Sequence, residues 1–293
     1  MKKAFASLAL LALLFAACGG SEGSEEAGQD PSTADNAPDE ITDAAAYPIF
    51  ASSEVVVGPN RFLIGVLDDN DAPIGSPGLD VSVAFEPLGE GTPIGSQPTE
   101  FLETVPGERG LYVATPEFDA AGAWSATVDI EGDGIDESIT QEFEVADESS
   151  TPEIGAPAPL SDTPTAKDVE SLKEISTATK PDPRFYQTSI KDAVDKGLPF
   201  VVVFATPKFC SSQVCGPTLD EVAEVTQDFP KLTVIHSEIY EGLEPNNPPV
   251  PAVLEWGLPS EPWIFVVDAE GKVVAKYEGS VGDAEIRPVL EEL

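Results

Sequence analysis

Short runs of β-branched and aromatic residues, separated by turn residues, fill the part of the chain from residue 47 to residue 147. Turn signals such as Ser76-Pro77-Gly78 and Pro106-Gly107 stand between several of the runs. Six or seven strands in about a hundred residues are typical of an antiparallel β-sandwich. The pattern therefore predicts an all-β domain, with strands over 61–67, 79–85, 100–104, 110–114, 123–130 and 138–145.

The part of the chain after residue 148 has a different pattern. Residues 201–205 are apolar without alternation, which predicts a strand covered on both faces. We predict further strands over 232–239, 263–267 and 272–277, and helices over 167–175, 189–196, 218–227, 252–256 and 283–293. This βαβ order, followed by a hairpin and a helix, predicts an α/β domain over 165–293, which a Pro-, Ser- and Thr-rich linker at 148–164 joins to the sandwich.

Two cysteines follow the buried run directly. The predicted strand leads through a short turn to Cys210, and Cys215 comes five residues later, just before the predicted helix. The dipole and the free N–H groups of a helix N-terminus favour the thiolate form of a cysteine. The strand-to-helix junction therefore predicts a thiol redox site made by Cys210 and Cys215.

The N-terminal residues form an export signal. Lys2 and Lys3 precede an apolar run over 4–17 that ends in small residues, and the run is too short for a permanent membrane span. Ala16, Ala17 and Cys18 resemble the lipobox of bacterial lipoproteins. The resemblance implies removal of the signal peptide 1–17, acylation of Cys18, and an extracytoplasmic protein anchored to the bacterial cell membrane by lipid.

Residues 18–46 are rich in Gly, Ser, Glu, Asp and Ala and contain almost no large apolar side chain. Such a segment buries too little surface to offset the entropy of ordering, so we predict a disordered acidic tether. The whole chain of 293 residues has 53 acidic and 15 basic residues and a net charge of -38. This charge disfavours nucleic acid and anionic lipid head groups as partners. Cys18, Cys210 and Cys215 are its only cysteines, which agrees with export to a compartment where disulfides persist.

The sequence GLYVATPEFDAAGAWSATVDI, residues 110–130, resembles the closing strands of immunoglobulin-like modules in exported bacterial proteins, including FixH-like and YtkA-like ones. The resemblance implies an immunoglobulin-like sandwich that serves as a spacer or docking platform. Residues 47–147 contain no His, Met or Cys, so the ligands that copper prefers are missing there. The acidic turn at 129–134 has Thr140 where a calcium loop carries its bidentate Glu, which favours a simple hairpin. We predict neither a metal nor another cofactor.

Residues 165–293 resemble a thioredoxin-fold domain. The stretch from Phe204 to Cys210 matches the strand and the aromatic-before-cysteine entry of that fold, and Pro262 stands where the fold has its cis-proline. The hairpin and closing helix after Pro262 match its second half. The resemblance implies that Cys210 attacks, that Cys215 resolves, and that Pro262 presents a strand edge to a bound peptide. The implied partners are thiols or disulfides of exported proteins.

Three alternatives stay open. Thioredoxins have two residues between their cysteines and a buried acid near the position of Val203, whereas this chain has four residues there and no such acid. The C-x4-C spacing resembles one group of peroxiredoxins, although Pro207 stands where those have Thr, and only Arg184 and Arg287 can supply an arginine. A thiol peroxidase is therefore the first alternative.

The other two alternatives involve no turnover. A copper chaperone of the Sco type pairs two cysteines with a distant histidine, for which His236 is the only candidate, although a histidine inside an apolar strand is more often structural. A binding or scaffold lipoprotein with a permanent structural disulfide is the last. Glu261 and Lys208 give no independent signal. The leading hypothesis is a membrane-anchored thiol-disulfide oxidoreductase.

Overall fold

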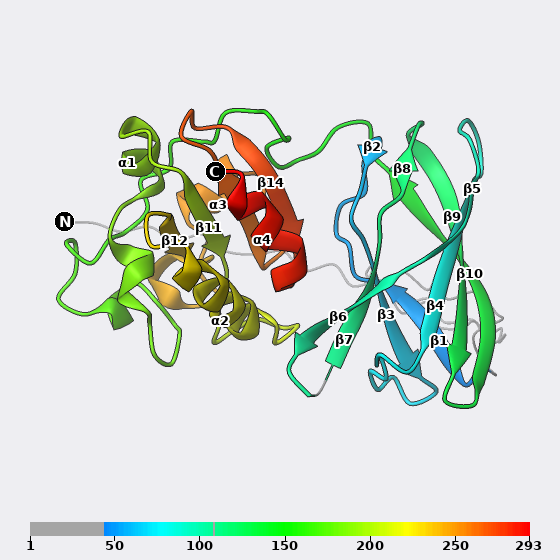
Figure 1. Cartoon of the computed structure of the whole chain (residues 1–293). Helices are drawn as coiled ribbons and strands as arrows, with labels where there is room; N and C mark the ends of the chain where they lie inside the picture. The colour runs from blue at the N-terminus through cyan, green and yellow to red at the C-terminus, as the bar shows by residue number, and fades with distance from the viewer. Residues whose placement is uncertain (1–43, 108) are drawn as a thin grey trace, which may run out of the picture. The chain divides into compact units, whose positions relative to one another are not determined.

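A computed structural model describes residues 44–107 and 109–293 (Figure 1). The predicted signal peptide, Cys18 and nearly all of the predicted tether lie outside these residues. In the part that is described, no helix is both long and apolar enough to cross a membrane. The described chain is mixed α/β and is treated below as a β domain, up to residue 147, and a C-terminal domain, from residue 148.

The β domain contains two four-stranded antiparallel sheets, with strand orders β1-β3-β7-β6 and β10-β9-β4-β5, and the short pair β2-β8. The strands are β1 (Ala46–Phe50), β2 (Gly58–Pro59), β3 (Phe62–Asp68), β4 (Asp80–Pro87), β5 (Ile94–Pro98), β6 (Glu100–Val105), β7 (Arg109–Ala114), β8 (Glu117–Phe118), β9 (Gly122–Gly132) and β10 (Ile135–Val145). All six predicted stretches form strands.

Both sheets contribute to one aromatic core. Burial alternates along β4 and β9, as expected for strands with one face inside. The ring of Phe62, on β3, lies 5.1 Å from that of Phe85, on β4, and Phe118 lies 4.9 Å from Trp124. Contacts between rings from different sheets show that the sheets pack face to face, as in a β-sandwich.

The hydrophobic pattern does not predict β1 and β5. Each is the outer strand of its sheet. Edge strands tolerate proline and glycine because one side of their backbone needs no partner, and Pro48, Gly95 and Pro98 lie in these two strands. Composition alone therefore makes both strands look like loops.

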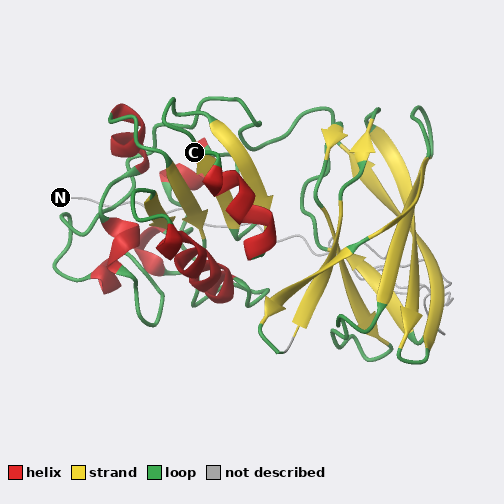
Figure 2. Ribbon diagram, viewed as in Figure 1, coloured by secondary structure: helices red, strands yellow, loops and turns green. Residues whose placement is uncertain are grey.

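The C-terminal domain is built on a mixed sheet with the order β12-β11-β13-β14, and helices lie on it (Figure 2). The central strand β11 is parallel to β12 and antiparallel to β13. The helices and strands of this domain are α1 (Ile190–Asp195), β11 (Phe200–Phe204), α2 (Cys215–Val225), β12 (Thr233–Ser237), α3 (Pro251–Glu255), β13 (Trp263–Val267), β14 (Val273–Glu278) and α4 (Asp283–Glu291). The domain also has 3-10 turns at Leu172–Glu174, Pro183–Tyr186, Thr226–Asp228 and Glu241–Leu243.

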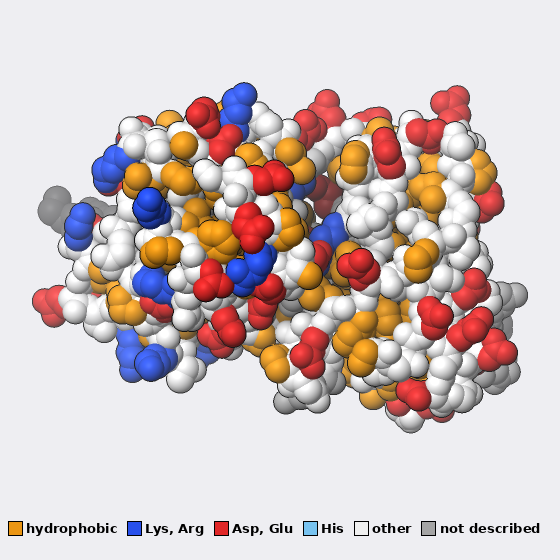
Figure 3. Space-filling view, viewed as in Figure 1, with side chains coloured by type: hydrophobic (Ala, Val, Ile, Leu, Met, Phe, Trp, Pro, Cys, Tyr) orange, Lys and Arg blue, Asp and Glu red, His pale blue; other side chains and the backbone are white. Residues whose placement is uncertain are grey.

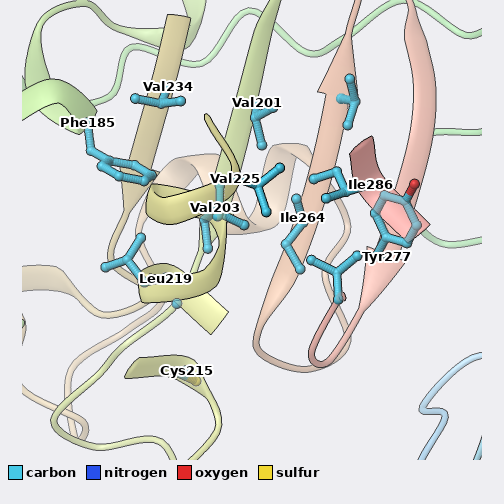
Figure 4. Packing of buried hydrophobic residues seen from close by; sticks show 14 of the residues in the cluster. Phe185, Val201, Val203, Cys215, Leu219, Val225, Val234, Ile264, Tyr277 and Ile286 are labelled. Carbon is cyan, nitrogen blue, oxygen red and sulfur yellow. The ribbon is translucent and has the colours of Figure 1, made fainter. Parts of the chain in front are cut away.

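All five residues of β11 are buried, so the strand is covered on both faces as its sequence predicts. Val201 and Val203 pack with α2 on one face (Figure 4). Phe204 packs with Trp256 and Phe265 on the other face. The rigid sheet beneath α2 therefore fixes the position of the helix and of the cysteine at its start.

The predicted helix over 167–175 is wrong. That stretch contains only the 3-10 turn Leu172–Glu174, which has no buried residue. The carboxylate of Asp168 accepts hydrogen bonds from both the N–H and the hydroxyl of Thr165, and Ser171 caps the 3-10 turn. Local side-chain bonds of this kind compete with helix formation, and the apolar side chains of the stretch that pack on the core, Leu172 and Ile175, are only partly buried.

Residues 155–163, expected to be linker, pack on the C-terminal domain. The N–H of Gly155 donates to the carbonyl of Val273, and Ala158 donates to Gly271. The side chain of Ala158 belongs to the core that contains Phe204. The Thr163 hydroxyl accepts the N–H of Ile190 at the start of α1. The packed part of this domain therefore begins before residue 165.

Charge is unevenly divided between the two domains. Residues 47–147 have 20 acidic and two basic residues, and residues 148–293 have 25 and 11. On the face seen in Figure 3, the Lys and Arg side chains lie mainly over the C-terminal domain, whereas Asp and Glu are spread over both domains. The basic residues do not form a continuous patch on this face.

Candidate active site

The sheet register brings three chain segments together at one end of the strands. Phe204, the last residue of β11, pairs with Ser237 of β12 and with Trp263 of β13. Because β12 is parallel to β11, Glu238 follows at the same end. Because β13 is antiparallel, its preceding residues, Glu261 and Pro262, come to that end as well. Side chains that are far apart in the sequence therefore meet beyond the C-terminal end of β11.

A tight turn connects β11 to the cysteines. The carbonyl of Thr206 accepts the N–H groups of Phe209 and Cys210, and the carbonyl of Cys210 accepts the N–H of Gln213. Gln213 has a φ of 61°, the left-handed conformation that lets the loop reverse before the helix. Helix α2 then begins at Cys215, three residues earlier than its predicted start.

Cys210 and Cys215 form a disulfide with their Cα atoms 6.0 Å apart. Side chains five positions apart diverge by about 140° on a regular helix and do not face each other. Here the two cysteines are not on one regular helix, because Cys210 lies in the turn and Cys215 is the first residue of α2. The four residues between them form the reversal that brings the two sulfurs together.

The two sulfurs have different surroundings. The backbone N–H of Cys215, at the N-terminus of α2, donates to Cys210 Sγ over 3.4 Å. The Ser212 hydroxyl lies 3.2 Å from the same sulfur. Cys210 is 8% exposed and Cys215 is completely buried. Donors of this kind stabilise negative charge on Cys210, and only Cys210 reaches the surface.

Cys215 faces a carboxyl group instead. Its Sγ lies 3.6 Å from Glu261 Oε2. The same oxygen accepts the N–H of Thr206 over 2.6 Å, which fixes the carboxyl beside the sulfur. Burial raises the pKa of Glu261, while its bonds from Thr206 act in the opposite direction. Sequence reasoning missed Glu261, although a residue directly before the predicted cis-proline had to lie beside the end of β11.

A second buried carboxyl lies at the end of β12. Glu238 accepts hydrogen bonds from both the N–H and the hydroxyl of Thr177. Its pKa is raised to about 7. Burial and the charge of Glu261 raise it, and they outweigh the bonds from Thr177 and Thr206, which lower it. The end of the sheet therefore holds two interacting acids next to one disulfide.

Pro262 lies at the start of β13 and is buried. The Glu261–Pro262 peptide bond is cis, the form that the resemblance implies. The carbonyl of Pro262 accepts the N–H of Gly279 over 2.9 Å. Glu261 brings this loop into contact with Cys215 and so places Pro262 at the candidate site.

His236 is a structural residue in this arrangement. Its Nε2 bonds to the carbonyl of Ala205 over 2.9 Å, and its Nδ1 lies 2.7 Å from the Tyr186 hydroxyl. Since Nε2 must donate to a carbonyl, Nδ1 accepts from Tyr186, and the ring is neutral. Burial lowers its pKa to about 4. Both nitrogens are occupied, so His236 is not free to bind copper with the cysteines.

Both candidate arginines of the peroxidase alternative are engaged elsewhere. Arg184 pairs with Asp182 and donates to the carbonyl of Ala223. Arg287 pairs with Asp283 and Asp228. Lys208 places its ammonium 4.7 Å from the centre of the Phe209 ring. Within residues 44–107 and 109–293, no three His, Cys, Asp or Glu side chains form a group suited to a metal ion.

Comparison with known proteins gives no assignment. No protein-family profile matches the chain, and no curated protein matches it. The case for a function therefore depends on the geometry around the disulfide.

Proposed function

We propose that the protein is a thiol-disulfide oxidoreductase, with Cys210 as the attacking thiolate and Cys215 as the resolving thiol. The observation that carries the proposal is the asymmetry of the pair. Cys210 has hydrogen-bond donors and limited exposure, and Cys215 is buried against a carboxyl group. A disulfide that serves only as a staple needs no such difference between its sulfurs.

The exchange takes place in two steps. The Cys210 thiolate attacks a client disulfide, a Cys210–client disulfide forms, and one client sulfur leaves as a thiolate that takes a proton from solvent. Cys215 then attacks Cys210 Sγ, the Cys210–Cys215 bond forms, and the second client sulfur leaves and is protonated. The client gains two electrons, which the cysteine pair loses. The same steps in reverse oxidise a client dithiol.

The surrounding fold supports the proposal. A strand that leads to a cysteine pair at a helix start, a cis-proline on the neighbouring strand, and a hairpin followed by a helix are the features on which the resemblance to thioredoxin-fold domains depends. In this proposal the segment of Glu261 and Pro262, which lies beside Cys215, contacts the client peptide. Cys18 carries the lipid that holds the protein at the outer side of the bacterial cell membrane, and the immunoglobulin-like β domain is a spacer.

The test uses a purified model client with one exposed disulfide. We expect Cys215→Ser, after reduction, to form a one-to-one adduct with the client, visible on a non-reducing gel and released by dithiothreitol. Cys210→Ser is the matched control and forms almost no adduct, because its remaining thiol is buried.

Two other results would redirect the assignment. If neither variant forms an adduct and the wild-type disulfide resists dithiothreitol in the folded protein, the bond is a structural staple and the proposal is wrong. If peroxide consumption depends on Cys210 and is faster than disulfide exchange, the protein is a peroxidase.

A further inference from the structure

The resolving step needs a group that accepts the proton of Cys215. A thiolate attacks disulfides and a thiol does not, so Cys215 must lose its proton before it reaches Cys210 Sγ. Cys215 is completely buried, and bulk water is therefore a poor acceptor at its sulfur. The acceptor has to be a protein group in contact with Sγ.

We propose that Glu261 is the general base of the resolving step. This inference rests on the proposed function, because it assigns the proton of the same exchange reaction. The Oε2 atom of Glu261 lies 3.6 Å from Cys215 Sγ, within reach of an S–H donor.

Thr206 holds the base in place. Its N–H donates to Glu261 Oε2 over 2.6 Å, and its hydroxyl oxygen accepts the N–H of Ile239, just after β12. Thr206 is itself 1% exposed and directly follows the buried strand β11 and Ala205. The carboxyl of Glu261 therefore keeps its position beside the sulfur when the disulfide opens.

Burial also raises the proton affinity of the acid. The pKa of Glu261 is raised by burial, toward that of a cysteine thiol. Proton transfer is more efficient when donor and acceptor have similar pKa values. A solvent-exposed glutamate at the same distance would be a weaker base for this thiol.

Glu238, the second buried acid, lines a cavity of about 320 Å³ together with His236, Ser237 and Tyr240. The charge of Glu261 raises the pKa of Glu238, so the two acids interact electrostatically.

The other charged groups nearby do not replace Glu261. On β12, His236 is neutral, and both of its ring nitrogens are bonded within the protein. In the turn after β11, the ammonium of Lys208 lies over the Phe209 ring. At the start of α2, the only titratable group that contacts Glu261 is Cys215 itself.

The S–H bond of Cys215 breaks and its proton goes to Glu261 Oε2. The Cys215 thiolate forms a bond to Cys210 Sγ, the bond between Cys210 and the client sulfur breaks, and the client thiolate leaves with the electron pair of that bond. In the reverse direction, protonated Glu261 returns the proton to Cys215.

Ellman's reagent separates the two steps without an identified client. In reduced full-length protein that carries Cys18→Ser, Cys210 attacks the reagent and releases one coloured thiolate, and attack by Cys215 on the resulting mixed disulfide releases the second. We expect Glu261→Gln to leave the first phase unchanged and to slow the second phase by roughly 10²-fold at pH 7, the lower end of general base effects. The acidic limb in the pH profile of the second phase should disappear as well.

Two matched variants complete the design. Glu244→Gln removes one negative charge from an exposed residue of the same domain and should leave both phases as in wild type. Glu261→Asp keeps a carboxylate but withdraws it by one methylene, so its second phase should be slower than wild type and keep its pH dependence. If Glu261→Gln fails to fold, Glu261→Asp decides alone.

A second phase with wild-type rate and pH profile in both Glu261 variants overturns the assignment of the base. Failure of the proposed function looks different, since no client adduct would then form although both phases with Ellman's reagent respond as described.

Discussion

The two domains bury different kinds of side chain. Apart from Tyr and Trp, the buried polar residues of the described β domain are limited to Thr104. The C-terminal domain buries twelve, and these are Thr151, Ser161, Thr163, Ser176, Ser189, Thr206, Thr218, Thr226, His236, Ser237, Glu238 and Ser280. Two of the twelve, His236 and Glu238, are titratable, and Glu261 is half-buried beside them.

This difference fits the proposed roles of the two domains, a scaffold and a reactive domain. Burying a titratable group costs free energy unless it is paired, so a chain gains nothing in stability from such groups. The β domain avoids this cost, because its core consists of apolar side chains and packed aromatic rings. In the C-terminal domain Glu238 and Glu261 lie at the end of the sheet beyond β11, and Glu261 contacts Cys215. Under the proposed function, the reaction compensates for the cost of burying them.

The largest effect on stability is expected when the N-terminal end of the C-terminal domain is cut away. The comparison of the two domains requires that the C-terminal core folds independently. We expect a fragment of residues 149–293 to unfold cooperatively in urea, followed by circular dichroism. A fragment of residues 165–293 should be unfolded, since it lacks the core residue Ala158 and the hydrogen bonds of residues 155–163, each worth roughly 1 kcal/mol. Equal stability of the two fragments would show that the segment 155–163 is only a linker.

The next effect concerns the aromatic core of the β domain. Trp124→Ala should destabilise that domain by about 4 kcal/mol, because it leaves a cavity and removes the ring that packs on Phe118. The reaction of Cys210 with Ellman's reagent should stay at the wild-type rate in the folded protein. Leu88→Ala is the control, since Leu88 is 52% exposed and its loss should change stability by less than about 0.5 kcal/mol. A slower Cys210 reaction in Trp124→Ala would contradict the scaffold role.

A third effect is the pH dependence of stability from Glu238. Its pKa is about 7 in the folded protein and 4.5 in the unfolded chain. Because the folded value is raised, the stabilisation is complete below pH 4.5 and is lost as the pH rises through 7. The loss amounts to about 3 kcal/mol.

The measurement is urea unfolding of wild type and Glu238→Gln at pH 5 and at pH 8. Between these two pH values Glu238→Gln should show a decline smaller by about 2.5 kcal/mol than wild type, because glutamine does not ionise. Glu244→Gln, which changes an exposed residue, should decline as wild type does. Equal declines in all three proteins would mean that Glu238 is ionised in the folded state without penalty.

The smallest effect on stability is expected from a change outside both cores. Cys18→Ser should leave the unfolding curves of both domains unchanged, because residue 18 belongs to the predicted tether. It should nevertheless release the protein from membranes into the soluble fraction, since the lipid has no attachment site. A variant that still sediments with membranes at high salt would refute the lipid anchor.

The sequence predicts the elements with strong local patterns. The uninterrupted run 201–205 predicts β11, and the predicted strand 263–267 coincides with β13. The edge strands β1 and β5 and the 3-10 turn at Leu172–Glu174 are not predicted, because long-range pairing and local side-chain bonds decide them. The early start of α2 depends on the left-handed Gln213, which no periodicity reveals.

The candidate site is predictable only in part. Cys210, Cys215 and Pro262 follow from motif and resemblance. Glu261 lies 46 residues from Cys215 in the sequence, and its role emerges only from the antiparallel register of β11 and β13. Val203 stands where thioredoxins have a buried acid. In the structure the carboxyl at the site belongs to Glu261, just before the neighbouring strand β13.

His236 makes the protein its own spectroscopic probe. It is the only histidine in the chain, so proton NMR should show one imidazole Cε1–H resonance that needs no assignment. With a pKa of about 4, that resonance should stay in place from about pH 6 to 8 in the folded protein and titrate only after unfolding. Its ring bonds to Ala205, the neighbour of Thr206, so reduction of the disulfide should shift the signal. A single unlabelled sample can thus report folding and redox state together.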